Sequence, residues 1–379
     1  MRRAPIAVVA LVAALATFTL ASSAGAQATE PKVAAAAWYL VGEDGSVLAG
    51  RDSARPRAIA SITKLMTAIV VLEHAKLGDV VRVSPRAAGI GESTVYLRAG
   101  EELTVAELLR ATLIPSANDA AEALALHVGK GSVDRFVELM NEKATDLGLT
   151  DTHFENPHGL DETGHVSSAR DTTALVRFAL GIPFIREALS RETLSLPGGR
   201  TFTTTDDLLA SWGPLVAGKT GHTRAAGWSQ AAAAQRGDTT VYGAVLGSGS
   251  RSSRNDALRA LLTYGLDQYR SVQVIDTSRI YATATTAYGR SDVDLVAPRG
   301  VASSIRVGRS LVERVVAPTA LALPIAKGDR LGRVEVYDGN RLVASSNLVA
   351  AESVPDAGLW AKAQWYATET VRNLWGMVT

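Results

Sequence analysis

The sequence predicts an α/β core built of strands, then helices, then strands, followed by a small all-β domain and a C-terminal helix. Residues 61–147 carry apolar side chains at helical spacing, whereas residues 33–49 and 215–246 contain short apolar runs typical of strands. From about Val272 onward, short apolar segments alternate with Gly, Pro and Asp-Gly turns. The 379 residues are enough for two such domains.

The composition excludes several classes of function. Lys and Arg number 39 against 38 Asp and Glu, so the chain lacks the basic excess of a nucleic-acid binder. The absence of cysteine excludes disulfides, thiolate nucleophiles and Cys-ligated metals. With 47% hydrophobic residues, the chain can bury a substantial core. Only 8 of the 39 basic residues are lysines, so each retained lysine is a candidate for a role that arginine cannot fill.

The N-terminus has the features of a secretory signal peptide. Met1-Arg2-Arg3 precedes an apolar run over residues 4–20, and small residues at A-x-A spacing follow at residues 24–28. We expect cleavage between Ala26 and Ala28, which makes residues 1–28 the signal peptide. An uncleaved membrane anchor is the alternative. Either one places the working protein outside the cytoplasm.

The elements of the core follow in order along the chain. A hairpin over residues 33–49 turns at Asp44-Gly45. A helix over residues 61–77 is ended by Gly78, and a second opens with the capping box Thr104–Glu107 and breaks at Pro115. Two more helices are expected, one from residue 119 onward and one over residues 132–147. Three strands should follow at residues 215–220, 227–234 and 240–246, and then a further helix at residues 254–269.

The C-terminal part combines a β-rich segment with an amphipathic helix. Strands are expected at residues 293–297, 311–316, 331–336 and 342–344. The final helix gathers Leu359, Trp360 and Trp375 on one face, with Lys362 and Arg372 on the other. We expect it to lie in the headgroup plane at the outer face of the cytoplasmic membrane, because its charges argue against spanning. The alternative is that the apolar face docks on the protein itself.

Ser61-Ile62-Thr63-Lys64 places a serine and a lysine one turn apart on a predicted helix, so the two side chains can meet. A serine hydroxyl needs a base, and a lysine among apolar neighbours can lose its proton where arginine cannot. The helix N-terminus would also favour an oxyanion. An ordinary solvated helix face is the competing interpretation of this motif taken alone.

Two further motifs carry polar groups that could line a cleft. Ser116-Ala117-Asn118 follows Pro115 between two helices, where a loop can direct a hydroxyl and an amide outward, although helix capping also accounts for both residues. Lys219-Thr220-Gly221 lies on a predicted strand. An ammonium and a hydroxyl there could bind a carboxylate, and Gly221 would let a ligand backbone approach the strand edge.

In this order, S-x-x-K, S-x-N and K-T-G resemble the three motifs of penicillin-recognising serine acyl transferases. More closely, the chain resembles low-molecular-mass penicillin-binding proteins that are D-alanyl-D-alanine carboxypeptidases. The similarity runs through residues 114–120, 152–161, 164–171 and 218–223 and extends weakly into residues 325–332. It implies a penicillin-binding-protein/β-lactamase-like transpeptidase core, an antiparallel sheet with a helical subdomain. Four parts of the chain are expected: the signal peptide (1–28), the catalytic domain (29–271), the β-rich C-terminal domain (272–354) and the amphipathic membrane-associating helix (355–379).

The resemblance also implies a reaction and its catalytic residues. Ser61 would be acylated by a peptidoglycan stem peptide ending in D-Ala-D-Ala, or by a β-lactam, and Lys64 would be its general base. Ser116 would relay a proton to the leaving amine. No cofactor is implied. His153, His158 and His165 match no metal-binding spacing, so we expect hydrogen bonds that organise a loop and no metal.

The remaining site residues would bind substrate, as the resemblance implies. Asn118 would hold the acyl-side amide, and the backbone N–H groups of Ser61 and His222 would form the oxyanion hole. Lys219 and Thr220, next to Gly221, would bind the terminal carboxylate, with Arg254 as an additional contact. The chain departs from the family pattern at residues 204–209, which are acidic where some members carry arginine or asparagine.

Three other functions compete with a carboxypeptidase. A serine β-lactamase would need a carboxylate to activate the deacylating water, and no E-x-x-L-N occurs between Asn118 and Lys219. An endopeptidase that cuts peptide cross-links would share all three motifs. A catalytically idle wall-binding scaffold would have no need of them.

Overall fold

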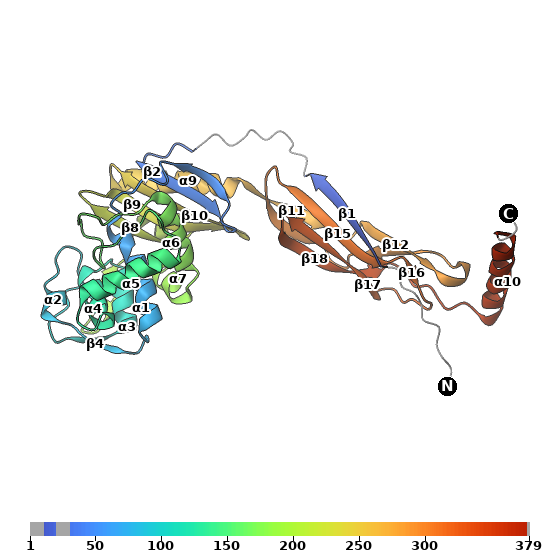
Figure 1. Cartoon of the computed structure of the whole chain (residues 1–379), viewed down its shortest axis with the longest axis horizontal. Helices are drawn as coiled ribbons and strands as arrows, with labels where there is room; N and C mark the ends of the chain where they lie inside the picture. Colours follow the sequence, from blue (N-terminus) through green and yellow to red (C-terminus); the bar gives the residue numbers. More distant parts are fainter. Residues whose placement is uncertain (1–10, 20–30, 377–379) are drawn as a thin grey trace. The chain divides into compact units, whose positions relative to one another are not determined.

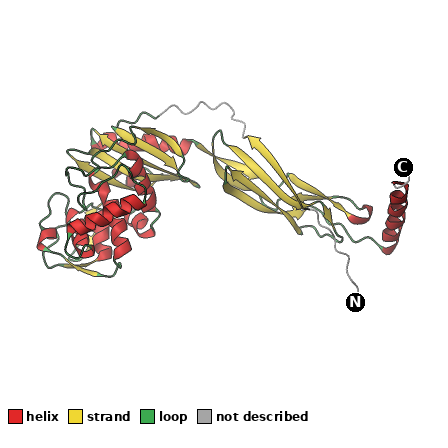
Figure 2. Cartoon of the chain, in the orientation of Figure 1, coloured by secondary structure: helices red, strands yellow, loops and turns green. Residues whose placement is uncertain are grey.

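The computed structural model describes residues 11–19 and 31–376 (Figure 1). The chain divides into two compact units. One runs to Gln268, and the other begins at Tyr269 and includes strand β1 (Leu11–Thr19). The predicted arrangement, an antiparallel sheet with helices followed by an all-β domain, is confirmed (Figure 2).

The first unit is organised around a five-stranded sheet with the order β3-β2-β10-β9-β8, in which every neighbouring pair is antiparallel. This order makes β8 an edge strand. Its neighbour β9 carries consecutive alanines at residues 231–234, which are small enough to let helices pack closely on both faces of the sheet. The strands are β2 (Ala37–Gly42), β3 (Val47–Arg51), β8 (Leu215–Thr223), β9 (Gly227–Arg236) and β10 (Thr239–Ser248).

Helices cover both faces of this sheet. On one face lies α9 (Arg251–Asp267), where Gly265 leaves room for Leu40 and Val241. The other face receives α6 (Ala169–Leu180), whose Thr173 hydroxyl donates to the backbone carbonyl of Tyr39. The two faces follow from the alternation of side chains along β2 and β10.

The remaining helices of the unit form a subdomain around α1, which is buried almost all round. A helix that is apolar on every side can be stable only when other helices enclose it. The elements are η1 (Ala60–Thr63), α1 (Lys64–His74), α2 (Pro85–Ala88), α3 (Val105–Leu113), α4 (Asn118–Val128), α5 (Val133–Asp146), α7 (Pro183–Leu189), α8 (Asp207–Ser211) and the short hairpins β4 (Val80–Arg82) with β5 (Glu102–Thr104) and β6 (Thr193–Leu196) with β7 (Arg200–Thr203).

The structure corrects the first helix. The sequence predicts one helix over residues 61–77, but a 3₁₀ turn, η1, precedes α1 and the helix ends at His74. The capping box at Thr104 is confirmed, because its hydroxyl accepts from Glu107 N at 3.2 Å and the Glu107 carboxylate accepts from Thr104 N at 2.7 Å.

The second unit is a β domain with its own apolar core. Its main sheet has the order β1-β15-β17-β18-β13-β12-β16, and β11 pairs separately with β14. The elements beyond β1 are β11 (Tyr269–Ile275), β12 (Ile280–Thr286), η2 (Ala287–Gly289), β13 (Val293–Val296), β14 (Val301–Arg306), β15 (Ser310–Pro318), β16 (Ala320–Leu321), β17 (Arg330–Asp338) and β18 (Arg341–Ala350).

The predicted signal peptide falls mostly outside the described residues. Of residues 1–28, only 11–19 are described, and they form β1, which pairs antiparallel with β15. At the other end, α10 (Leu359–Gly376) follows the β domain. Within residues 11–19 and 31–376, every helix is too short or too polar to cross a bilayer.

Candidate active site

Ser61 lies in the tight turn η1 immediately before α1, and the backbone of this turn packs closely against two glycines, Gly159 and Gly221. Ala60 has a φ of 49°, which is costly for a residue with a Cβ. A Cβ on Gly159 would lie 2.0 Å from the Ala60 carbonyl oxygen, and one on Gly221 would lie 2.6 Å from that of Ile59. Only glycine at both positions lets the Ser61 turn fit against its neighbours.

Lys64 opens α1 with its side chain fully buried, and three oxygen atoms surround its amino group. Nζ lies 2.8 Å from Ser61 Oγ, 2.7 Å from Asn118 Oδ1 and 2.8 Å from the His158 carbonyl oxygen. Burial, and then the nearby charge of Lys219, lower the pKa of Lys64 well below its ordinary value. A neutral amine at this distance from a hydroxyl can accept its proton.

The Ser116 turn joins α3 to α4 on the other side of the cavity. Ser116 adopts a φ of 66°, and its hydroxyl accepts a 2.8 Å hydrogen bond from Lys219 Nζ. Asn118 is the first residue of α4, and its amide nitrogen donates to the Gly91 carbonyl oxygen at 3.1 Å. Neither side chain therefore caps α4, as the alternative interpretation of this motif would require.

The third motif lies on the edge strand β8. Lys219 is buried, and burial lowers its pKa to about 7. The Thr220 hydroxyl bonds that of Thr205 at 2.6 Å, and the His222 ring stacks on Trp228 with centroids 4.0 Å apart. An edge strand leaves backbone groups available to an extended ligand.

A cavity of about 210 Å³ joins the three motifs. Six of the nine predicted site residues line it: Ser61, Ser116, Thr220, Gly221, His222 and Arg254. The other three, Lys64, Asn118 and Lys219, lie directly behind its wall, because their polar atoms bond to Ser61, Lys64 and Ser116 respectively. Ser93, Thr205, Trp228 and Arg251 complete the lining.

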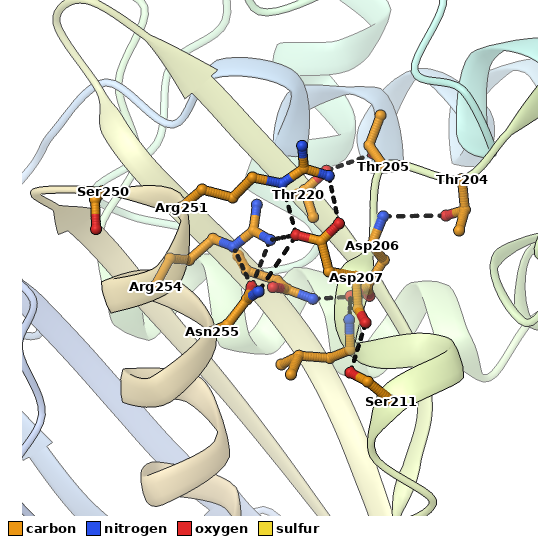
Figure 3. A network of polar contacts seen from close by, with 12 residues as sticks. Thr204, Thr205, Asp206, Asp207, Ser211, Thr220, Ser250, Arg251, Arg254 and Asn255 are labelled. Atoms are coloured by element: carbon orange, nitrogen blue, oxygen red, sulfur yellow. Dashed lines mark hydrogen bonds and ion pairs between the residues drawn. The ribbon is translucent and has the colours of Figure 1, made fainter.

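Figure 3 shows the polar network at the Thr220 end of this cavity. Asp207, at the start of α8, pairs with Arg251 and Arg254 from the first turn of α9. Asn255 Oδ1 accepts from Arg254 Nε at 3.1 Å and from Arg254 Nη2 at 2.6 Å. Arginine side chains at the end of a cleft can bind a carboxylate.

Sequence reasoning missed several groups that hold the site. The Asp119 carboxylate accepts backbone hydrogen bonds from Val95 at 3.2 Å and Leu97 at 3.0 Å, which fixes the loop that carries Ser93. Its pKa is raised by burial, against these hydrogen bonds. The His158 carbonyl oxygen gave no signal, because every residue type carries one. Gly159 could have been noticed only as one glycine among 33.

The histidine-rich loop is organised by hydrogen bonds. His165 Nε2 lies 2.7 Å from the Thr63 hydroxyl, and its Nδ1 accepts from Glu155 N at 3.1 Å. Burial lowers the pKa of His165 to about 4 and that of His158 to about 3. Across the described part of the chain, there is no group of three acidic or histidine side chains arranged to hold a metal ion.

The chain is similar to known families and proteins over most of its length. Residues 24–250 match the family profile described as D-alanyl-D-alanine carboxypeptidase, and residues 269–356 match the C-terminal domain of penicillin-binding protein 5. The D-alanyl-D-alanine carboxypeptidase DacD of Escherichia coli is 31% identical over 94% of this chain and 97% of its own length. DacF of Bacillus subtilis is 30% identical over 83% of this chain and 84% of its own length.

Solved structures show the same architecture. Penicillin-binding protein 5 from Haemophilus influenzae has a TM-score of 0.63 at 26% identity, covering 86% of this chain and 99% of its own. The Streptomyces K15 DD-transpeptidase has a TM-score of 0.60 at 31% identity, covering 63% of this chain and 99% of its own. The predicted transpeptidase-like fold is thereby confirmed.

Proposed function

The chain belongs to the D-alanyl-D-alanine carboxypeptidase family, and from this premise we propose how its own residues perform the reaction. The chain is a serine peptidase that removes the terminal D-alanine from peptidoglycan stem peptides and binds β-lactams. In our proposal, Ser61 forms the acyl-enzyme. The observation that carries this assignment is the 2.8 Å contact between Ser61 Oγ and the buried, pKa-lowered amine of Lys64.

Acylation would begin with proton transfer from Ser61 to neutral Lys64. The Ser61 oxygen attacks the carbonyl carbon of the penultimate D-alanine, and the backbone N–H groups of Ser61 and His222 stabilise the oxyanion. The C–N bond breaks, and the proton that Lys64 took from Ser61 passes through the Ser116 hydroxyl, which Lys219 Nζ contacts, to the leaving amine, so that Lys64 is neutral again. Water then cleaves the ester, with Lys64 again as the base.

Substrate binding in this proposal uses the rest of the cavity. The peptide lies along the open edge of β8, as an added strand would. Asn118 holds the acyl-side amide, and Gly221 allows a close approach. The terminal carboxylate reaches Thr220 and Arg254, which line the same end of the cavity, with the charge of Lys219 behind them.

Two measurements on the purified protein test this assignment. Free D-alanine should appear from a pentapeptide, and intact-mass analysis after benzylpenicillin should show one covalent adduct. Ser61→Ala should abolish both, whereas Ser190→Ala, an exposed serine outside the cavity, should keep both. No adduct on the wild-type protein would reject the proposal in favour of a scaffold.

Two further assays separate the carboxypeptidase from a β-lactamase and an endopeptidase. A serine β-lactamase would turn over a chromogenic cephalosporin rapidly and leave no lasting adduct. An endopeptidase would release monomers from cross-linked dimers faster than D-alanine from pentapeptide. We expect a long-lived adduct and the preference for pentapeptide.

We also propose that the protein is exported by residues 1–28 and rests on the outer face of the cytoplasmic membrane through α10. Leu359 and Trp360 are each 88% exposed. On the side of the helix away from Trp360, Trp365 and Tyr366 pack against Tyr288 of η2, with ring centroids 5.5 and 5.9 Å away. The helix is thus tethered by one side while the Trp360 side is left for the headgroup region.

A further inference from the structure

Asp207 bonds two guanidinium groups that line the active-site cavity (Figure 3). Its Oδ2 lies 2.6 Å from Arg251 Nε and 3.4 Å from Arg254 Nη2, and its Oδ1 bonds Arg251 Nη2. Burial alone would raise the pKa of Asp207, but hydrogen bonds from Arg251 and Asn255 and the two arginine charges hold it below its ordinary value. A fixed negative charge therefore sits against the two lining arginines, Arg251 and Arg254, that would receive the substrate's terminal carboxylate.

Arg254 is held mainly by groups other than Asp207. Its side chain is 2% exposed, and its guanidinium lies 5.9 Å from the centroid of the Trp228 ring. Asn255 Oδ1 accepts from two of its nitrogens, at 3.1 and 2.6 Å, whereas the contact to Asp207 is 3.4 Å long. Losing the Asp207 charge should therefore leave Arg254 in place and change mainly the electric potential around it.

The neighbouring acidic residue has a different task. Asp206 is buried, and its carboxylate accepts from Leu208 N at 3.0 Å and from Gln230 Nε2 at 2.7 Å. Asp207, with 38% of its side chain exposed, is the one that contacts both arginines. The two adjacent aspartates thus differ in role: Asp206 holds the local backbone and Gln230, whereas Asp207 contacts the two arginines that line the cavity.

We propose that Asp207 competes with the substrate's carboxylate for Arg251 and Arg254 and so shortens the stay of the cleaved amino acid. The inference rests on the proposed function of Ser61. After acylation, free D-alanine is held by its carboxylate alone, because its peptide bond is broken. A built-in anion weakens that hold, whereas the acyl group stays fixed through its ester bond.

This competition bears on the fate of the acyl-enzyme. If water attacks the ester carbonyl, the C–O bond to Ser61 breaks, the peptide leaves as an acid and Ser61 regains its proton. If the amine of a bound D-amino acid attacks instead, an amide bond forms, the same C–O bond breaks and the amine's proton passes to Ser61. Faster departure of the amino acid favours hydrolysis. The second route is open to this fold, since one relative is named a DD-transpeptidase.

The test compares Asp207→Asn with the wild-type protein and with Asp238→Asn, an exposed aspartate in the β9–β10 turn. In Asp207→Asn, the KM for pentapeptide should fall about three- to tenfold, as expected for one partly screened charge. The value of kcat should not rise. Incorporation of isotope-labelled D-alanine into the peptide should increase by a similar factor, and both effects should shrink in high salt. Asp238→Asn should match wild type.

Two outcomes would overturn the inference. An unchanged KM would show that the Asp207 charge is not felt by the ligand, and a raised KM would show that Asp207 orients the arginines. Asp207→Ser, neutral and smaller, should act in the same direction as Asp207→Asn and covers the case in which one variant misfolds. Asn255→Ala should raise KM, because it releases Arg254. Release of D-alanine by the wild-type protein tests the proposed function separately.

Discussion

Lys219 Nζ donates a 2.8 Å hydrogen bond to Ser116 Oγ, which joins the edge strand of the sheet to a turn of the helical subdomain. A second lysine–serine pair, Lys64 with Ser61, lies in the adjoining wall at the same distance. Both lysines are buried and both have lowered pKa values. The cavity is therefore bordered by two amines that release a proton more readily than an ordinary lysine, a property that arginine could not supply at these positions.

The base role of Lys64 can be tested by Lys64→Arg. A guanidinium keeps the positive charge but does not lose its proton, so acylation by benzylpenicillin should slow by about 10²–10⁴-fold. Lys76→Arg, at an exposed position, serves as the control. Stopped-flow or gel-based measurement of the acylation rate checks this. A rate equal to wild type in Lys64→Arg would exclude Lys64 as the base.

The pH dependence of the carboxypeptidase activity should reveal the titration of Lys219. With a pKa of about 7, its amine is charged below that pH and neutral above it, so binding of a carboxylate should weaken as pH rises through about 7. On the acid side, kcat/KM should fall once Lys64 takes up a proton, because the protonated amine is no base. A bound carboxylate favours the charged form of Lys219. The alkaline fall should therefore lie at higher pH in kcat than in kcat/KM, and coincident limbs would contradict the assignment.

Gly159 should matter to catalysis more than its position in a loop suggests. A Cβ there would lie 2.0 Å from Ala60 O and 3.0 Å from Ser61 N, at a φ of +86°. We expect Gly159→Ala to displace the Ser61 turn, reducing β-lactam acylation more than tenfold, and to destabilise the unit by about 2 kcal/mol or more.

Gly164→Ala is the matched control for that substitution. It also has a positive φ, +94°, but the three atoms nearest to its Cβ would all belong to the Glu155 side chain, which can move. It should cost about 1 kcal/mol of stability and leave acylation within about twofold of wild type. Thermal unfolding with the acylation rate distinguishes the two variants, and equal losses would refute the special role of Gly159.

Membrane association should depend on the exposed side of α10. Leu359→Ala combined with Trp360→Ala removes two side chains that are each 88% exposed, and should weaken binding to anionic lipid vesicles at least tenfold, as expected for the apolar area removed from the interface. Leu342→Ala, an exposed leucine on β18, should bind like wild type. Sedimentation with vesicles measures this. Equal binding by all three proteins would assign the contact to another surface.

The sequence predicted the order of the main elements because their signals are local. Apolar periodicity revealed α1, α3, α4, α5 and α9, whereas α6 and α7 were not predicted. The Thr104 capping box marked the start of α3, and Gly or Pro marked several helix ends. The strands β11, β12 and β14 were not predicted, since their mixture of polar and apolar residues lacks a clear alternation. The η1 turn before α1 was also missed, because it depends on backbone packing against Gly159 and Gly221.

The candidate site was predictable only where side chains carry the chemistry. Lys64, Ser116 and Lys219 stand out as residue types in short motifs, whereas the carbonyl of His158 and the loop clamp of Asp119 depend on contacts across the fold. The pairing of Asp207 with Arg251 joins residues 44 positions apart. Such contacts arise from topology, which no local pattern encodes.

The two buried lysines also affect how the first unit resists unfolding. An unfolded lysine holds its proton up to about pH 10.4, whereas Lys219 releases it near pH 7 in the folded chain, so unfolding takes up protons between these values. The free energy of unfolding should therefore rise with pH between about 7 and 10.4. Urea titrations at two pH values in this range would reveal the increase. The folded state should therefore be most stable at alkaline pH, where neutral Lys219 binds a carboxylate least well. Any enzyme with a catalytic amine buried away from water has the same mismatch between the pH of greatest stability and the pH of greatest activity.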